Sequence, residues 1–141
     1  MCDIQKRQEE IVAEFALLED PFDRYAYLLE LAALLPMMSE ERRQSLTPVA
    51  GCQSHVWLDI RAEDGSLVLE ADSDTMLIRG IVYLLCRVLS GQPLGDAAEA
   101  ELDFLQRSGI VPSLSADRRK GIGYVVREVQ RRAAELRDAS C

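Results

Sequence analysis

The stretch HVWLDIRAEDGSLVLEA, residues 55–71, changes the hydrophobic period of the chain and decides its class of fold. Val56, Leu58 and Ile60 alternate with residues that point the other way, which predicts a strand with one buried face. The Asp-Gly pair at 64–65 is typical of a tight turn, and the apolar pattern resumes directly after it. The stretch therefore predicts a β-hairpin.

A hairpin alone is only marginally stable in water, so we expect a third strand beside it. The segment Leu46–Ala50 is the best remaining candidate. Together these segments predict a small, about three-stranded, antiparallel sheet. Its apolar face needs a cover of helices.

Helical periodicity occupies the rest of the chain on both sides of the hairpin. Asp20, Ser73 and Ser115 are the expected N-caps of three of these helices. Gly80 lies inside the most apolar helix, where glycine costs roughly 1 kcal/mol against alanine. We therefore expect close packing there, against the sheet or the Cys52 loop. The expected helices span about 4–18, 21–35, 74–90, 96–108 and 115–137, with a short turn near 39–43.

Length and charge limit the possible functions. The 141 residues suit one α+β domain, residues 1–141, and contain no apolar run long enough to span a membrane. Sixteen basic against 24 acidic residues give a formal charge of −8. This charge argues against nucleic acid or anionic lipid as the main partner. The charged N-terminus does not resemble a signal peptide, so we expect a cytoplasmic protein.

Cys52 is the strongest candidate for chemistry. Gly51 directly before it permits a sharp turn, and loops on a rigid scaffold often carry function. The alternative is that Cys52 is a small buried hydrophobe. Cys52 and His55 form half of a metal site, but the chain holds no second histidine and no cysteine close in sequence, so we expect no metal.

The other three cysteines are weaker candidates. Cys86 lies in the apolar run YLLCRVL, where burial keeps a thiol inert. Cys2 and Cys141 are at the chain ends and lack fixed surroundings. All four are widely spaced, which in a reducing compartment indicates free thiols rather than disulfides.

Two charged clusters are candidate interfaces. Asp72 and Asp74 flank the expected start of the helix after the hairpin, where carboxylates complement the helix dipole; partner contact is the alternative. Arg118, Arg119 and Lys120 lie in the first turn of the last helix, where the dipole disfavours positive charge. At least one of them is therefore a candidate for binding an anion or an acidic partner.

Four motifs in order resemble the SufE/CsdE family of sulfur acceptors. They are FDRYAYLLELAALLP, VAGCQSHVWL, ADSDTMLIRG and LSADRRKGIGYVVREV, and the likeness extends from about Phe15 to Arg132. Gly51, Cys52, Ser54, Val56 and Trp57 carry its central motif. The motifs are common to the SufE and CsdE branches and do not separate them.

The resemblance implies a SufE/IscU-like fold and a function. Cys52 would take persulfide sulfur from a PLP-dependent cysteine desulfurase of the SufS/CsdA type, stimulate it, and pass sulfur to an iron–sulfur assembly complex. Gly51, Ser54 and His55 would support the loop, and Asp74 and Arg118 would lie toward the desulfurase. The chain itself would need no cofactor. The resemblance does not decide whether the chain forms a homodimer. The alternatives are an iron–sulfur scaffold of similar fold, or an interaction protein with an inert cysteine.

Overall fold

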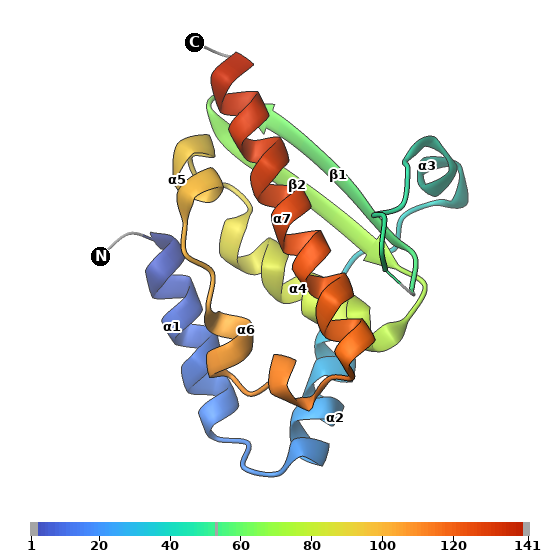
Figure 1. Cartoon of the computed structure of the whole chain (residues 1–141), viewed down its shortest axis with the longest axis vertical. Coiled ribbons are helices and arrows are strands. Elements are labelled where there is room, and N and C mark those ends of the chain that lie inside the picture. The colour runs from blue at the N-terminus through green and yellow to red at the C-terminus, as the bar shows by residue number, and fades with distance from the viewer. Residues whose placement is uncertain (1–2, 53, 140–141) are drawn as a thin grey trace.

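The computed structural model describes residues 3–52 and 54–139, in which several helices pack with one β-hairpin (Figure 1). This arrangement confirms the predicted α+β class. Within these ranges, no helix combines the length and apolar character that a membrane crossing requires. The elements in chain order are α1 (Asp3–Ala16), α2 (Pro21–Ala32), α3 (Glu40–Ser45), β1 (Val56–Glu63), β2 (Ser66–Ser73), α4 (Met76–Leu89), α5 (Leu94–Glu99), α6 (Phe104–Arg107), the 3-10 turn η1 (Val111–Ser113) and α7 (Ala116–Ala139).

The predicted hairpin is confirmed, with its turn at the expected residues. Strands β1 and β2 are antiparallel, and Val56 pairs with Ser73 at the open end. Asp64 and Gly65 both have positive φ, 52° and 79°, as a tight hairpin turn of the favoured twist requires. Alternate residues of β1 are buried from Val56 to Ile60. The hairpin therefore has one core face, as the alternation indicated.

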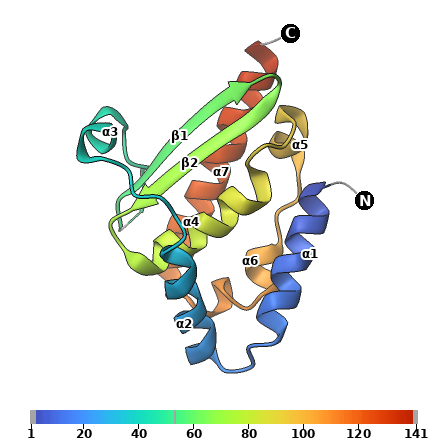
Figure 2. The ribbon, with the colours of Figure 1, turned by 180° about the vertical axis from the view of Figure 1, so that it is seen from behind.

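Two helices cover that face. The nearly all-apolar α4 packs against β2, and the long α7 crosses β1 on the same side (Figure 1). Seen from behind, no helix crosses the other face of the hairpin (Figure 2). There, Arg42 of α3 and Arg61 of β1 each pair with both Asp59 and Glu70. Charged side chains thus cover the outer face, and apolar ones the inner face.

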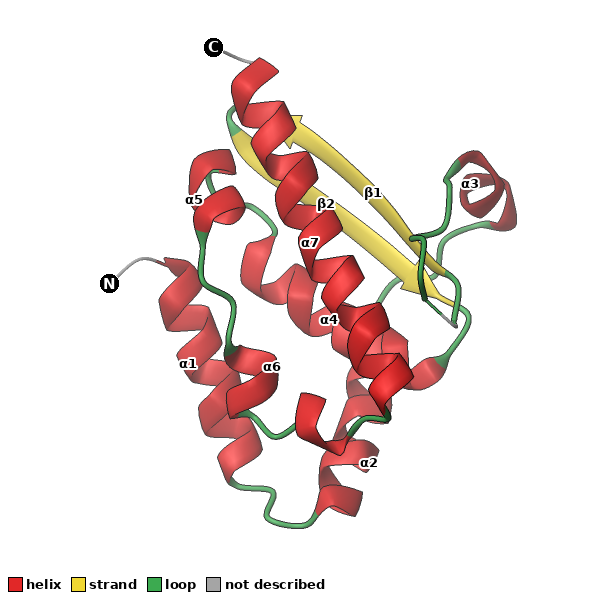
Figure 3. Ribbon diagram, in the orientation of Figure 1, coloured by secondary structure: helices red, strands yellow, loops and turns green. Residues whose placement is uncertain are grey.

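The expected third strand does not form. The described sheet has two strands, and residues 46–50 are loop (Figure 3). One backbone hydrogen bond, from Val49 N–H to the Val56 carbonyl at 2.9 Å, joins this loop to β1. Pro48 has no N–H to donate, and the chain turns at Ala50 and Gly51 immediately afterwards. The hairpin is instead stabilised by α4 and α7.

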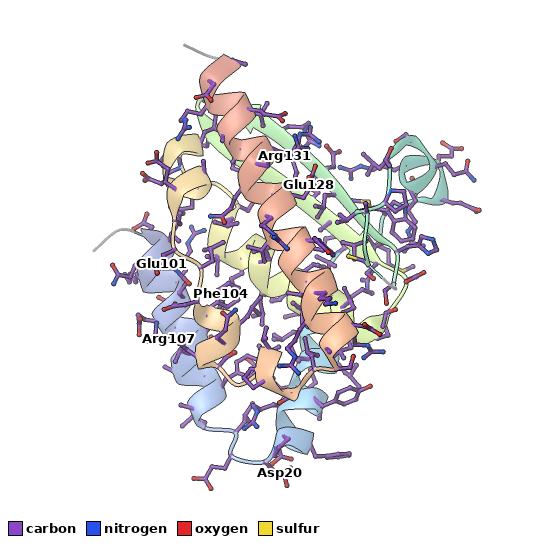
Figure 4. The ribbon with its side chains drawn as sticks, viewed as in Figure 1. Asp20, Glu101, Phe104, Arg107, Glu128 and Arg131 are labelled. Atoms are coloured by element: carbon purple, nitrogen blue, oxygen red, sulfur yellow. The ribbon has the colours of Figure 1, made fainter. Side chains whose placement is uncertain are left out.

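The single helix expected over 96–108 is two short helices, because side chains from other elements satisfy the backbone where it breaks. The buried Gln8 of α1 accepts hydrogen bonds from the N–H groups of the first residue of α6 and the residue before it, and donates to the Glu101 carbonyl. Gln130 of α7 donates to the Ala100 carbonyl at 2.8 Å. Glu101 is labelled at this break in Figure 4.

Two of the three predicted N-caps are confirmed. The Asp20 carboxylate and the Ser115 hydroxyl each accept a backbone N–H from the first turn of their helix. Ser73 is not an N-cap: it ends β2, and its hydroxyl donates to the His55 carbonyl at 2.8 Å. Helix α4 starts after Thr75 instead.

The close packing expected at Gly80 is confirmed, but the neighbour differs. An added Cβ would overlap the backbone carbonyl oxygen of Leu28. Helix α2, rather than the sheet or the Cys52 loop, therefore lies against α4 at this glycine.

Asp72 lies within β2 rather than at the helix start, and its side chain is fully buried. Its carboxylate forms ion pairs with Arg79 of α4 and Arg43 of α3, and it accepts the Met38 backbone N–H at 2.9 Å. Burial opposes ionisation, but these partners outweigh it and hold the pKa of Asp72 below its usual range. Asp72 thus joins the hairpin, α3 and α4 rather than serving the α4 dipole.

Candidate functional site

The loop before β1 bends at Gly51 and lies against α7. Gly51 has a φ of +88°, in the left-handed region that favours glycine. An added Cβ would lie 2.6 Å from two ring atoms of Tyr124, so any side chain would collide with the helix. The predicted sharp turn is confirmed. The closeness of Tyr124 is a second reason why glycine is required at position 51.

Cys52 is seated against α7 rather than presented at the tip of the loop. Its thiol donates a hydrogen bond to the Gly121 carbonyl, with Sγ 3.2 Å from the oxygen. A Cβ added at Gly121 would lie 3.4 Å from Sγ, so the absence of a side chain there lets the thiol approach the helix.

A small cavity adjoins the thiol. Its volume is about 10 Å³, close to what one water molecule needs. Burial raises the pKa of the Cys52 thiol, so at neutral pH the seated group is protonated and a weak nucleophile. The seat therefore protects the sulfur rather than activating it. Residues lining the cavity include Cys52, Ser54, Val56, Ile78, Arg118 and Ile122.

The downstream side of the loop is fixed by the turn between β2 and α4. The Ser54 and Thr75 hydroxyl oxygens are 2.6 Å apart. Asp74 accepts the His55 backbone N–H at 3.1 Å, and its second oxygen lies 2.8 Å from His55 Nδ1. Burial raises the pKa of Asp74, but the hydrogen bonds from His55 and Thr75 outweigh it and leave this pKa below the usual value. Asp74 thus anchors the end of the Cys52 loop.

The His55 ring lies on the outer side of the hairpin. It stacks on Trp57 with ring centroids 5.7 Å apart and 14° between the planes. His55 thus lies on the same side of the strand as Trp57. With Nδ1 held by Asp74 and the Cys52 thiol bonded to Gly121, this geometry does not make His55 the base for the thiol.

Arg118 lies beside Cys52. Its residue lines the Cys52 cavity and also a neighbouring cavity of about 220 Å³, together with Arg24 and Tyr25. The structure shows no ion pair for Arg118 with residues 3–52 or 54–139. The fold thus places Arg118 at the same cavity as the thiol, whereas Asp74 contacts His55 on the downstream side of the loop.

The remaining cysteines are separate from this site. Burial, with a smaller effect of Glu70, raises the pKa of Cys86 to about 12, which supports its prediction as an inert thiol. Cys52 and Cys86 are free thiols. Cys2 and Cys141 lie outside the described residues. In the described part of the chain, no three His, Cys, Asp or Glu side chains converge as a metal site would require.

Gly121, Tyr124 and Thr75 belong to the site but were not predicted. A signal was present for Gly121, because the pair of glycines in GIG at 121–123 lies inside a helix, where glycine is unfavourable. Glycine inside a helix indicates close packing at Gly121 just as it does at Gly80. No comparable signal marks Tyr124 or Thr75, whose roles depend on which loop reaches them.

Most of the chain matches a known protein family and its members. A family model named SufE, described as an Fe-S metabolism associated domain, matches residues 9–133. An uncharacterized SufE-like protein of Rhizobium etli is 33% identical over 94% of this chain and 92% of its own length. A second, from Rhizobium meliloti, is 34% identical over 89% of this chain and 93% of its own length.

A solved structure shares the fold. The solution structure of a hypothetical protein from Thermus thermophilus superposes with a TM-score of 0.76 over 92% of this chain and 95% of the other, at 20% identity. Its arrangement of elements therefore recurs in a distant sequence.

Proposed function

The chain belongs to the SufE family, which is associated with Fe-S metabolism, and from this membership we propose that it is a sulfur carrier. Cys52 accepts persulfide sulfur from a PLP-dependent cysteine desulfurase of the SufS/CsdA type. The chain stimulates that enzyme and passes the sulfur to an iron–sulfur cluster assembly complex. Its free thiols suit a reducing compartment, for which we propose the cytoplasm.

The transfer is a thiol exchange that this chain performs without a cofactor of its own. The Cys52 thiolate attacks the outer sulfur of the partner's persulfide, a new S–S bond forms on Cys52, and the partner's S–S bond breaks. The partner cysteine leaves as a thiolate, and the proton lost by Cys52 balances its charge. No net oxidation or reduction takes place.

The observation that carries the proposal is the seat of Cys52 against Gly121. There the thiol is protonated and partly shielded, with little space around it. Reaction with a partner requires the loop to leave α7 and expose the sulfur, and return of the loop shields the persulfide from solution reagents. Gly51 is the joint at which the chain can turn, and the Ser54–Thr75 and His55–Asp74 contacts hold the other side of the loop.

Arg118 has one role in this scheme. Its guanidinium offers a positive charge to an acidic partner surface. We propose Arg118 and Asp74 as parts of the desulfurase-facing surface, with Asp74 acting through His55. Since neither charge is buried in a core ion pair, both can be tested without unfolding the chain.

Intact mass spectrometry tests the sulfur site. After incubation with a cysteine desulfurase, PLP and cysteine, the chain should gain one sulfur. Cys52→Ser should abolish the gain, whereas Cys86→Ser and Cys141→Ser should keep it. A Cys52→Ser protein that still carries the sulfur and still stimulates the desulfurase would disprove the proposal.

Desulfurase stimulation tests the surface. Arg118→Glu should weaken stimulation while leaving the fold intact, because a surface charge contributes little to stability. Arg119→Glu is the matched control, one residue along and exposed. Stimulation by Arg118→Glu that equals that of the unaltered chain would remove Arg118 from the interface.

The scaffold alternative makes an opposite prediction. A scaffold needs several ligands that converge on the cluster, and the described residues contain no such group. Anaerobic reconstitution with iron and sulfide should leave the protein colourless. A stable brown protein that depends on Cys52 would favour the scaffold function.

A further inference from the structure

One edge of the hairpin has main-chain groups that point away from the fold. The Val56 carbonyl accepts from Val49 and therefore faces away from β2, whereas the His55 carbonyl accepts from Asp74 on the β2 side. Because N–H and C=O directions alternate along an antiparallel strand, those of Leu58, Ile60 and Ala62 also face outward. No residue among 3–52 and 54–139 forms a hydrogen bond with these groups.

The edge of β2 is occupied at its start. Leu67 donates its N–H to the Gln92 carbonyl at 2.8 Å and accepts from Gly91 at the same distance. Leu94 donates to the Gly65 carbonyl at 3.1 Å. Residues 91–94 therefore lie beside the first residues of β2 as a neighbouring strand would. An unprotected edge is a template for pairing, and proteins usually blunt or cover it.

A groove of about 1220 Å³ follows the open edge of β1. Leu58 and Ile60 are among its lining residues; one wall is the loop 45–51 and the other is α7 between Tyr124 and Ala134. This volume exceeds the roughly 300–1,000 Å³ of most small-molecule pockets. An extended peptide segment fits a groove that combines this size with a free strand edge.

The charge of the lining selects the occupant. Arg127, Arg131 and Arg132 line the groove with a single acidic residue, Glu128, although the whole chain carries a formal charge of −8. Arg131 is paired with Glu128 and with a further glutamate, and Figure 4 labels Arg131 and Glu128 where α7 crosses the hairpin. The remaining positive charge favours acidic side chains. It disfavours a second copy of this chain, whose own groove would bring the same arginines.

We propose that the open edge of β1 binds an extended acidic segment of a partner protein as a third strand. The segment pairs its main chain with Leu58, Ile60 and Ala62, and its acidic side chains face the arginines of α7. The segment lies along β1 beyond Val49, whose N–H already bonds to the Val56 carbonyl at the start of the same edge. This groove adjoins the Cys52 site, with which it shares Gly51 and Tyr124, and binding in it needs no sulfur transfer.

Amide hydrogen exchange resolved by NMR tests the proposal on the full chain. The probe is an acetylated and amidated peptide of alternating glutamate and valine, and a lysine–valine peptide of equal length is the charge control. The acidic peptide should protect the Leu58, Ile60 and Ala62 amides in a saturable manner. The amides of the residues between them already face β2 and should change little. The lysine peptide should give no protection.

Variants separate pairing from charge. Ala62→Pro removes one outward N–H at an exposed edge position, where proline is tolerated, and should abolish protection. Ala62→Val, which keeps the N–H, should retain it. Arg127→Glu with Arg132→Glu should weaken binding about tenfold, as a change of about 1.4 kcal/mol implies. Lys6→Glu on α1 should not.

Three results would overturn the proposal. The first is no protection at about millimolar acidic peptide. The second is protection that does not alternate along β1 or that survives Ala62→Pro. The third is concentration-dependent protection without peptide, accompanied by dimers in sedimentation, which would make a second copy the occupant.

Discussion

The packing of Cys52 against Gly121 predicts that one substitution both stabilises the chain and lowers the reactivity of the Cys52 thiol. In Gly121→Ala, the new methyl group would lie 3.4 Å from Cys52 Sγ and 3.5 Å from its Cα, which are ordinary van der Waals contacts. Alanine is favoured over glycine inside a helix by about 1 kcal/mol. Because no atom must move, we expect the free energy of unfolding to rise by about this amount, or about 4 °C in Tm for a chain of this size.

Gly123→Ala is the matched control two residues along the same helix. Its added methyl would meet only the end of the flexible Arg127 side chain, at 3.8 Å. The gain in helix propensity is the same, so the two variants should have nearly equal stability. Only Gly121→Ala adds a methyl group over the thiol and strengthens the desolvation that raises the Cys52 pKa.

Two measurements follow. Urea unfolding followed by circular dichroism gives the two stabilities, and alkylation with iodoacetamide, followed by peptide mass spectrometry, gives the rate at Cys52. The rate should fall in Gly121→Ala and stay unchanged in Gly123→Ala. Equal alkylation rates in both variants would show that Cys52 does not rest on α7. A destabilised Gly121→Ala would show that the contact is tighter than the structure gives.

Three further predictions concern the frame around the site. Gly80→Ala should lower the free energy of unfolding by about 1–3 kcal/mol in urea titration despite its better helix propensity, because its methyl overlaps the Leu28 carbonyl; a stabilised variant would contradict the contact. Asp72→Ala should lower the free energy of unfolding by about 3–5 kcal/mol, because Arg79 stays buried without its carboxylate partner. Asp72→Leu combined with Arg79→Leu should recover part of this loss. If the losses in stability of the two substitutions simply add, the pair is not coupled. Hydrogen bonds from two arginines lower the pKa of Glu70 to about 2, so its stabilisation is present above pH 4.5 and is lost as pH falls toward 2. The free energy of unfolding, measured across this pH range, should fall less steeply in Glu70→Gln than in the unaltered chain. Parallel curves of stability against pH would show that Glu70 does not cause the fall.

Local patterns predicted the parts of the fold that depend on neighbours in sequence. The alternation at Val56, Leu58 and Ile60, the turn at Asp64 and Gly65, and most helices follow from side-chain period and backbone preference. The two failures have different causes. The helix over 96–108 breaks because Gln8 and Gln130, which are far away in the chain, bond to its backbone. Residues 46–50 stay a loop for a local reason, because Pro48 has no N–H and the chain turns at Ala50 and Gly51.

The sequence by itself determined that Cys52 follows a turn that Gly51 permits and precedes a half-buried strand, because glycine conformation and strand period are local properties. Its motif also indicated the family. Only the tertiary structure decided that the thiol rests on Gly121 beside Arg118, that His55 pairs with Asp74, and that the edge of β1 stays open. Each of these depends on α7, which lies about 70 residues along the chain from Cys52, or on the turn before α4. No local preference encodes which carbonyl, ring or empty edge such distant elements bring together.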